Sequence, residues 1–245
     1  MRLLASVRSA NEVLAAVSGG ADIIDAKEPT RGSLGAVAPE VFAWIQARVP
    51  LDLELSAALG DVASPLEVRT RIAALGAVPR PTPVFLKLGF AGVGRPRRIK
   101  ALLEVACTAA REMGCPSARV IAVAYADNEN AGCADPGTVW DAAASAGVAG
   151  VLLDTWSKGG RHLFDWIEPE PVRDLVNQAR CAGLLTALAG GLGPEQLPAA
   201  CQVDPDIVGF RGALCQGGRD GKVSQARVRR LKTLLEASDS VHQPN

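Results

Sequence analysis

The chain alternates short apolar runs with longer segments in which apolar residues recur every three or four positions. Most of the short runs are almost continuously apolar, which is typical of parallel strands covered on both faces. The eight predicted strands are Leu3–Ser6, Asp22–Ala26, Leu51–Ala57, Val84–Leu88, Val120–Ala124, Gly150–Asp154, Leu184–Ala189 and Ile207–Phe210. The eight predicted helices are Ser9–Ser18, Pro39–Val49, Ser64–Leu75, Arg97–Met113, Asp135–Gly147, Glu170–Cys181, Pro194–Ala200 and Ser224–Glu236.

The regular order of strands and helices decides the fold class. Eight strands, each followed by a helix, favour a single (β/α)₈ TIM barrel over a doubly wound sheet, and 245 residues is a usual length for that barrel. No shift in composition or low-complexity linker divides the chain. The sequence therefore predicts one catalytic barrel domain over residues 1–236, followed by a flexible C-terminal tail over residues 237–245.

The balance of charge narrows the class of partner. The chain has 26 Lys and Arg residues against 26 Asp and Glu residues, and only 4% aromatic residues. This balance argues against a nucleic-acid surface or a membrane-surface face. No apolar run approaches the length of about 20 residues that a membrane span needs, and no signal peptide is expected at the N-terminus.

Cysteine and histidine spacing indicates neither a disulfide framework nor a metal site. The six cysteines are scattered without a CxxC pair, so we expect reduced thiols in a cytoplasmic protein. No HxH or HExxH spacing occurs, and no GxGxxG follows the first strand. We therefore expect no metal and no cofactor.

Candidate chemistry collects where the strands of the predicted barrel end, which is where TIM-barrel active sites lie. Asp25 and Lys27 are two positions apart, so their side chains should project side by side from the second strand. Lys87 interrupts an apolar run, and a buried lysine is disfavoured unless it is paired. Asp154 and Lys158 follow at the sixth strand. Three of the six lysines in the chain thus fall at one rim.

This cluster suits amine chemistry. Neighbouring cations lower the pKa of a lysine from about 10.4, and a neutral amine can then attack a carbonyl to form a Schiff base while a carboxylate and a second lysine move protons. The alternative is that the charges are structural ion pairs that close the barrel mouth.

Glycine-rich turns after the last two strands favour phosphate binding. Gly190 and Gly191 follow the seventh strand, and Arg211 and Gly212 follow the eighth. Backbone amides in these two loops hold phosphate in many TIM barrels, although ordinary tight turns have the same composition. Ser56, near the end of the third strand, is a further candidate for substrate binding.

His162 is a weaker candidate. It follows the sixth strand and could contact substrate, but a histidine in such a loop is more often solvated or caps a helix.

The motifs around these residues resemble those of the (5-formylfuran-3-yl)methyl phosphate synthase family over about residues 3–235. The segments that carry the resemblance are Gly19–Pro29, Gly32–Ala36, Lys87–Gly89, Tyr125–Asp127, Leu153–Thr155, Lys158–Gly160, Ala189–Gly190 and Asp206–Gly212.

The resemblance implies a Schiff-base lyase that condenses two glyceraldehyde 3-phosphate molecules with loss of phosphate and water, the first furan-forming step of methanofuran-type cofactor biosynthesis. It implies that Lys27 forms the Schiff base, that Lys87 accepts protons, and that Asp25, Asp154 and Lys158 support them. The expected partner is a triose phosphate, and a homo-oligomer is expected. Two alternatives stay open: a class I aldolase acting on another phosphorylated aldehyde, and a non-catalytic phosphometabolite-binding barrel.

Overall fold

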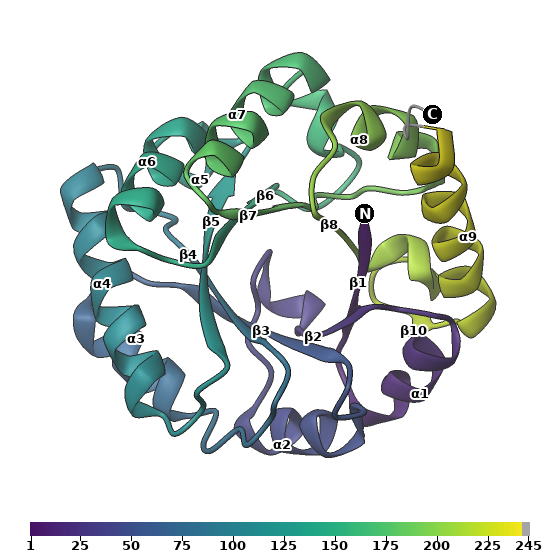
Figure 1. Ribbon diagram of the computed structural model, residues 1–245, viewed down its shortest axis with the longest axis horizontal. Helices are drawn as coiled ribbons and strands as arrows, with labels where there is room; N and C mark the ends of the chain where they lie inside the picture. The colour runs from purple at the N-terminus through teal and green to yellow at the C-terminus, as the bar shows by residue number, and fades with distance from the viewer. Residues whose placement is uncertain (242–245) are drawn as a thin grey trace.

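The eight parallel strands predicted from the sequence close into one barrel. A computed structural model of the protein describes the backbone of residues 1–241 and the side chains through residue 238. The strands are hydrogen-bonded in the order β1 to β8, with β8 pairing back to β1. Helices surround this ring (Figure 1). The predicted (β/α)₈ TIM barrel is confirmed.

The elements follow one another with short loops. The barrel strands are β1 Arg2–Val7, β2 Ile23–Ala26, β3 Glu54–Asp61, β4 Val84–Gly89, β5 Ala118–Tyr125, β6 Gly150–Asp154, β7 Leu185–Leu188 and β8 Ile207–Phe210. The helices are α1 Ala10–Ser18, α2 Pro39–Arg48, α3 Pro65–Ala73, α4 Pro96–Glu112, α5 Asn128–Ala131, α6 Pro136–Ala146, α7 Pro169–Cys181, α8 Leu197–Val203 and α9 Gln225–Val241. Short 3₁₀ turns are η1 Pro29–Arg31, η2 Leu163–Asp165, η3 Pro194–Gln196 and η4 Gly212–Leu214, and β9 Cys215–Gln216 pairs with β10 Lys222–Val223 in a hairpin.

Several predicted boundaries were wrong, including those of the third strand and of the C-terminal tail. The third strand was expected over Leu51–Ala57, but β3 spans Glu54–Asp61, because Leu51 and Asp52 form a turn that leaves Leu51 exposed. The C-terminal tail was expected from residue 237, but α9 continues to Val241. Residues 242–245 of the predicted tail lie outside the described residues.

Helix starts follow local capping chemistry. Ser64 and Glu67 form a reciprocal capping box at the start of α3, with Pro65 in the first turn. The Asp135 carboxylate accepts from the backbone amide of Thr138 at the start of α6. These interactions fix where each of the two helices begins.

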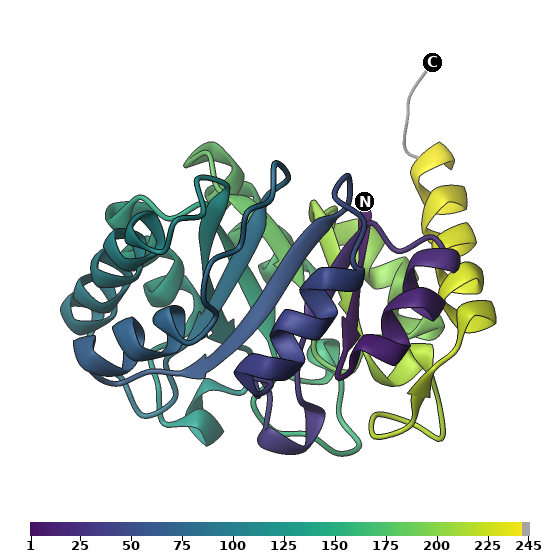
Figure 2. The same cartoon turned by 90° about the horizontal axis from the view of Figure 1, so that it is seen from below.

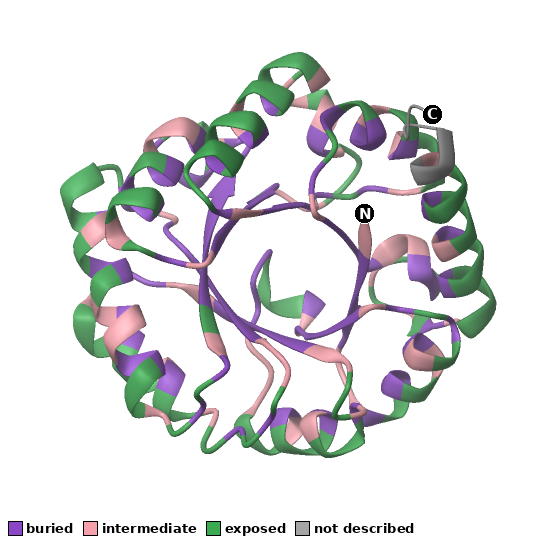
Figure 3. Ribbon diagram, in the orientation of Figure 1, coloured by how far each residue is buried: buried purple, intermediate pink, exposed green. Residues whose placement is uncertain are grey.

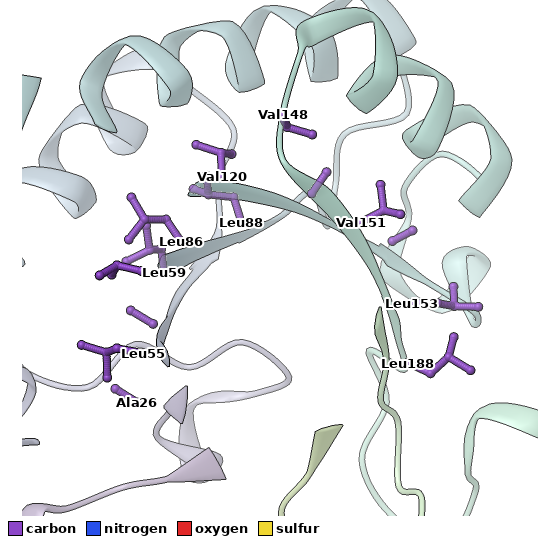
Figure 4. Close-up of a cluster of buried hydrophobic side chains, with 14 of the residues drawn as sticks. Ala26, Leu55, Leu59, Leu86, Leu88, Val120, Val148, Val151, Leu153 and Leu188 are labelled. Carbon is purple, nitrogen blue, oxygen red and sulfur yellow. The ribbon is translucent and has the colours of Figure 1, made fainter. Parts of the chain in front are cut away.

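The main hydrophobic core lies between the strands and the helices. Side chains such as Leu86, Leu153 and Leu188 point away from the barrel axis and are fully buried (Figure 4). Buried positions follow the barrel wall and the inner faces of the helices, and exposed positions follow the outer faces (Figure 3). A second, smaller cluster of buried side chains occupies the barrel interior.

The carboxyl ends of the strands meet at one face of the barrel. In Figure 2 the loop that holds η1 and the β9–β10 hairpin lie together at the lower edge of the molecule. Across the described residues, no helix combines the length and apolar character needed to cross a membrane. All six cysteine thiols are free.

Candidate active site

Polar side chains face the barrel interior near the carboxyl ends of four strands. On β1, β2, β4 and β6 the interior residue two positions earlier is apolar, so each polar residue stands above an apolar one. The polar residues are Ser6, Asp25, Lys87 and Asp154, and all four are buried. Polar groups at such positions need partners, and the partners show how the site is built.

Asp25 and Lys87 form a buried pair between β2 and β4. Lys87 Nζ lies 2.7 Å from Asp25 Oδ1 in an ion pair. Ser6 Oγ donates to Asp25 Oδ2 at 2.8 Å. Burial raises the pKa of Asp25, but the charges of Lys87 and Lys27 outweigh it and hold the pKa below its usual value. Asp25 is therefore an anion that keeps Lys87 in place.

The Asp154 carboxylate contacts two lysines, Lys158 and Lys27. Its Oδ1 accepts from Lys158 Nζ at 2.9 Å and from the backbone amide of Thr155 at 2.7 Å. Its Oδ2 lies 3.6 Å from Lys27 Nζ and accepts from Ser33 Oγ at 3.0 Å. Burial raises the pKa of Asp154, but Lys158, Lys27 and these hydrogen bonds lower it well below its usual value.

Lys27 differs from its two neighbouring lysines because its amine nitrogen has no close polar partner. Lys158 Nζ donates to Asp154 and to both oxygens of Thr155, and Lys87 pairs closely with Asp25. Lys27 Nζ makes no hydrogen bond within the described part of the chain, and its nearest charge partner is 3.6 Å away. Burial lowers its pKa to about 8, with Asp154 opposing this and Lys158 and Lys87 adding to it. Lys27 is thus the lysine best prepared to act as a nucleophile.

A cavity of about 820 Å³ opens at this rim. The predicted residues that line it are Lys27, Ser56, Lys87, Asp154, Lys158, Gly190, Gly191, Arg211 and Gly212. Asp25 stands behind Lys87 and is fully buried. The fold therefore brings together the residues that the sequence placed at the barrel mouth.

Sequence comparison gives the family. A family model described as 4-HFC-P synthase matches residues 3–232. The chain belongs to the 4-HFC-P synthase family. It is 38% identical over 241 residues to a "(5-formylfuran-3-yl)methyl phosphate synthase" of Methanothermobacter thermautotrophicus, covering 97% of this chain and 100% of the relative. It is also 38% identical to a "Putative (5-formylfuran-3-yl)methyl phosphate synthase" of Streptomyces griseus, covering 93% and 91% of the two chains. These named synthases indicate that the protein is an enzyme.

Solved structures with the same fold are more distant in sequence. A phosphoribosylanthranilate isomerase from Thermotoga maritima superposes with a TM-score of 0.59 at 18% identity, covering 96% of this chain and 98% of that one. A 3-hexulose-6-phosphate synthase from Salmonella typhimurium gives a TM-score of 0.60 at 16% identity, covering 97% and 100%. At these identities the likeness shows the TIM-barrel fold alone.

Within this family member, the side chain of Arg211 is fully used in contacts with the protein. Its guanidinium is buried and pairs with Glu12, with Nη1 to Oε2 at 2.6 Å. Its other donors bond to the backbone carbonyls of Ser6, Arg219 and Gly221. With all its nitrogens committed to protein acceptors, the side chain ties the β8 loop to β1 and α1.

His162 adopts the helix-capping role that sequence reasoning left open. Its backbone amide donates to Asp165 Oδ2 at 2.7 Å at the start of η2, and its Nε2 lies 3.3 Å from Asp165 Oδ1. The residue lines the cavity, but its polar contacts are to its own turn.

Sequence reasoning missed the residues that hold the loops of this enzyme together. Ser33, from the loop after η1, bonds to Asp154 and to the Thr155 carbonyl, 121 and 122 positions away in the chain. Arg219 donates to the carbonyls of Pro29 and Gly32 and so joins the β8 loop to the loop that follows Lys27. These contacts depend on loop paths that periodicity does not describe.

Proposed function

We propose that this protein condenses two glyceraldehyde 3-phosphate molecules into (5-formylfuran-3-yl)methyl phosphate, with loss of phosphate and water, through a Schiff base on Lys27. The proposal rests on one observation above the others: the amine of Lys27 lines the cavity, has a pKa of about 8 and has no hydrogen-bond partner among the described residues. Membership in the 4-HFC-P synthase family supports the same reaction. In this proposal the protein is a cytoplasmic carbon–oxygen lyase that catalyses the first furan-forming step in the biosynthesis of methanofuran-type cofactors.

The first step needs a neutral amine next to a proton donor. The Lys27 nitrogen adds to the aldehyde carbon of one substrate molecule, the carbonyl oxygen takes up protons and leaves as water, and an imine remains. Lys158 is held beside this centre by Asp154, with its ammonium 2.9 Å from the carboxylate, and can supply a proton to the departing oxygen. Asp154 then stabilises the positive charge of the iminium ion that forms.

The second step needs a base for the carbon next to the imine. Lys87, on β4, is close enough for its charge to influence the pKa of Lys27. Once deprotonated, its amine can take the carbon-bound proton and leave an enamine, which adds to the aldehyde of the second molecule. Asp25 anchors Lys87 through its carboxylate, and the later losses of water and phosphate use the same proton carriers.

Backbone amides are the proposed phosphate ligands. The amides of Gly190 and Gly191 make no hydrogen bond within the described residues, and both glycines line the cavity with positive φ. Gly212 begins η4 at the end of the neighbouring strand. Amides in this position bind phosphate without adding charge, and the contribution of Arg211 would come through its backbone.

The test combines product detection with trapping. Wild-type protein incubated with glyceraldehyde 3-phosphate alone should develop the ultraviolet absorbance of a furan aldehyde, and borohydride should add a substrate-derived mass to Lys27. Lys27→Arg should lose both signals, because arginine keeps the charge but cannot form the imine. Lys100→Arg is the matched control, since Lys100 lies on the outer face of α4 and pairs with Glu104.

Each failure has a distinct meaning. Trapping at Lys27 without a furan product would favour a class I aldolase with another acceptor. Absence of both signals in the wild-type protein would favour a non-catalytic phosphometabolite-binding barrel. Normal furan formation by Lys27→Arg would rule out Lys27 as the nucleophile.

A further inference from the structure

Arg219, in the turn between β9 and β10, lines the cavity without a carboxylate partner. Six lysines and arginines of the described chain line this cavity. A carboxylate lies 3.6 Å or less from four of them: Lys27, Lys87, Lys158 and Arg211. The fifth, Arg161, stacks on Trp166, with its guanidinium carbon 4.7 Å from the ring centroid. Only Arg219 has backbone carbonyls as its sole partners among the described residues.

The Arg219 guanidinium is held at one edge and free at the other. Nη2 donates to the carbonyls of Gly32 at 2.6 Å and Pro29 at 2.9 Å, and Nε donates to Pro29 at 3.3 Å. Nη1 makes no hydrogen bond within the described residues and keeps accessible surface. The backbone is fixed too, because Arg211 Nε donates to the Arg219 carbonyl at 3.0 Å. A ligand that binds Nη1 therefore meets a side chain that is already ordered.

The charge of Arg219 is not neutralised by a close partner. The residue is half-buried, and burial lowers the pKa of Arg219, while the more distant carboxylates of Asp154 and Asp220 raise it. Arginine nevertheless stays protonated in proteins, and its nitrogens can only donate hydrogen bonds. A half-buried cation with a free donor edge favours a ligand that is both an acceptor and an anion.

Arg219 is held at a different side of the barrel mouth from the amides proposed for one phosphate. Gly190 and Gly191 follow β7, whereas Pro29 and Gly32, whose carbonyls hold the guanidinium, follow β2. In the barrel, β8 and β1 lie between these two strands. A ligand that carries two phosphate groups can therefore place one at each side of the cavity.

We propose that Arg219 binds a second phosphate group of the substrate through Nη1, in addition to the phosphate held by the amides of Gly190 and Gly191. The ligand class is a phosphate monoester, whose oxygens accept from a guanidinium and whose charge balances it. The proposal rests on the proposed function in one respect: two triose phosphates bring two phosphate groups into the cavity, and glycine amides supply no charge for the second.

The test uses two unreactive ligands that differ by one phosphate group. Glucitol 6-phosphate and glucitol 1,6-bisphosphate have the carbon chain length of two joined trioses, and neither has a carbonyl group that could form an imine. Calorimetric titration of the wild-type protein should show about 10- to 100-fold tighter binding of the bisphosphate, as expected for hydrogen bonds to a charged group. In Arg219→Gln this preference should fall to about twofold, because either phosphate can still occupy the one remaining site.

Arg161→Gln is the matched control, since it removes the same charge from the same cavity. Arg161 is exposed and stacks on Trp166, so the preference for the bisphosphate should stay within about threefold of the wild-type value. An equal loss of preference in the two variants would mean that the overall positive charge of the cavity, and not Arg219, binds the second phosphate. That result would overturn the proposal.

Thermal unfolding without ligand separates phosphate binding from a structural role. Arg219→Gln loses the hydrogen bonds to the carbonyls of Pro29 and Gly32, so its melting temperature should fall by about 3 °C. The proposal requires that the preference for the bisphosphate be lost as well. A lower melting temperature with that preference intact would mean that Arg219 only joins two loops, and would overturn the proposal.

The binding results also distinguish this inference from the proposed function. Equal affinity for the two ligands in the wild-type protein would overturn the second phosphate site, even if the same preparation makes a furan from glyceraldehyde 3-phosphate. A clear preference that depends on Arg219, in a protein that makes no furan, would support the phosphate site and reject the reaction. Failure to bind either ligand would overturn the phosphate site, and the furan assay alone would then judge the reaction.

Discussion

The two halves of the barrel interior are filled differently. In the half formed by β2 to β5, which we call the packed half, Ile23, Val123 and Tyr125 are 0% exposed, and Leu34 reaches in from the loop after η1 to pack against them. In the half formed by β6 to β8 and β1, which we call the open half, Ala187 and Leu4 keep 9% and 8% of their surface exposed to the cavity. Small residues, Ala187 and Gly209, line the cavity in the open half.

This difference explains how one barrel can be both rigid and accessible. TIM barrels usually fill their interior with layers of side chains, and the packed half does so. Asp25 and Lys87 project from the packed half, where close neighbours restrict their rotamers. The cavity is lined mostly by residues of the open half and its loops, and Lys87 reaches it from the packed half. A substrate that enters over the open half can therefore meet Lys87 without displacing the groups that hold it.

The largest expected effect is a loss of stability when a glycine is replaced by alanine in the packed half but not in the open half. A Cβ at Gly89, on β4, would meet Asp61 and Tyr125 and would come within 2.8 Å of Leu34 Cδ1. A Cβ at Gly209, on β8, would find its nearest atoms, Ala189 Cβ and Leu4 Cδ2, at 3.5 Å. Neither glycine has a positive φ, so the backbone tolerates alanine at both positions. Gly89→Ala should lower the free energy of unfolding by about 3 kcal/mol, through overpacking.

Gly209→Ala is the matched control for that substitution. Its free energy of unfolding should change by less than about 1 kcal/mol, with a gain expected from the lower backbone entropy of the unfolded chain. Its activity should fall, because the methyl group enters the cavity. Urea unfolding monitored by circular dichroism measures the stability of both variants. Equal destabilisation of the two variants would show that the halves are packed alike.

The next effect concerns the pH dependence of Lys27, which stands where the two halves meet. Burial and neighbouring cations lower its pKa to about 8. The neutral amine is the reactive form, so the initial rate of reductive trapping with cyanoborohydride should rise about tenfold per pH unit below pH 8 and level off above it. In Lys158→Met the midpoint should move upward, because a cation is lost and Asp154 is left less neutralised. A midpoint that stays in place would mean that the charge of Lys158 does not set the reactivity of Lys27.

Sequence periodicity was sufficient to predict the barrel and the position of the lysine cluster at its mouth. Apolar runs ending at Asp25, Lys87 and Asp154 each placed a charged residue at a strand end, and parallel strands bring such ends together. Periodicity could not show that Leu34, a loop residue, packs into the barrel interior. Nor could it show that Glu12 pairs with Arg211, because their contact spans 199 positions and depends on the path of the β8 loop.

Ser56 illustrates a second kind of limit. The sequence placed it at a strand end together with Asp25, but its lack of a hydrogen-bond partner is a property of exact side-chain geometry. Ser6 has the same residue type and a similar position, yet it is paired. Residue type and spacing predict which groups reach a site; which of them stay available for a ligand depends on packing.

The smallest expected effect tests whether the packed half serves only to support the site. Tyr125 donates from its hydroxyl to Asp61 Oδ1 at 2.8 Å, and burial together with this carboxylate raises the pKa of Tyr125 well above its usual value. Tyr125→Phe removes one hydrogen bond to a charged group and should lower the free energy of unfolding by about 1.5 kcal/mol. Because Tyr125 lies in the packed half, the rate of furan formation should change less than about threefold, which corresponds to about 0.7 kcal/mol. The measurement pairs urea unfolding with the initial rate from glyceraldehyde 3-phosphate. A rate reduced by more than tenfold at unchanged stability would place Tyr125 among the proton-transfer groups, and the chemistry would then extend across both halves of the barrel.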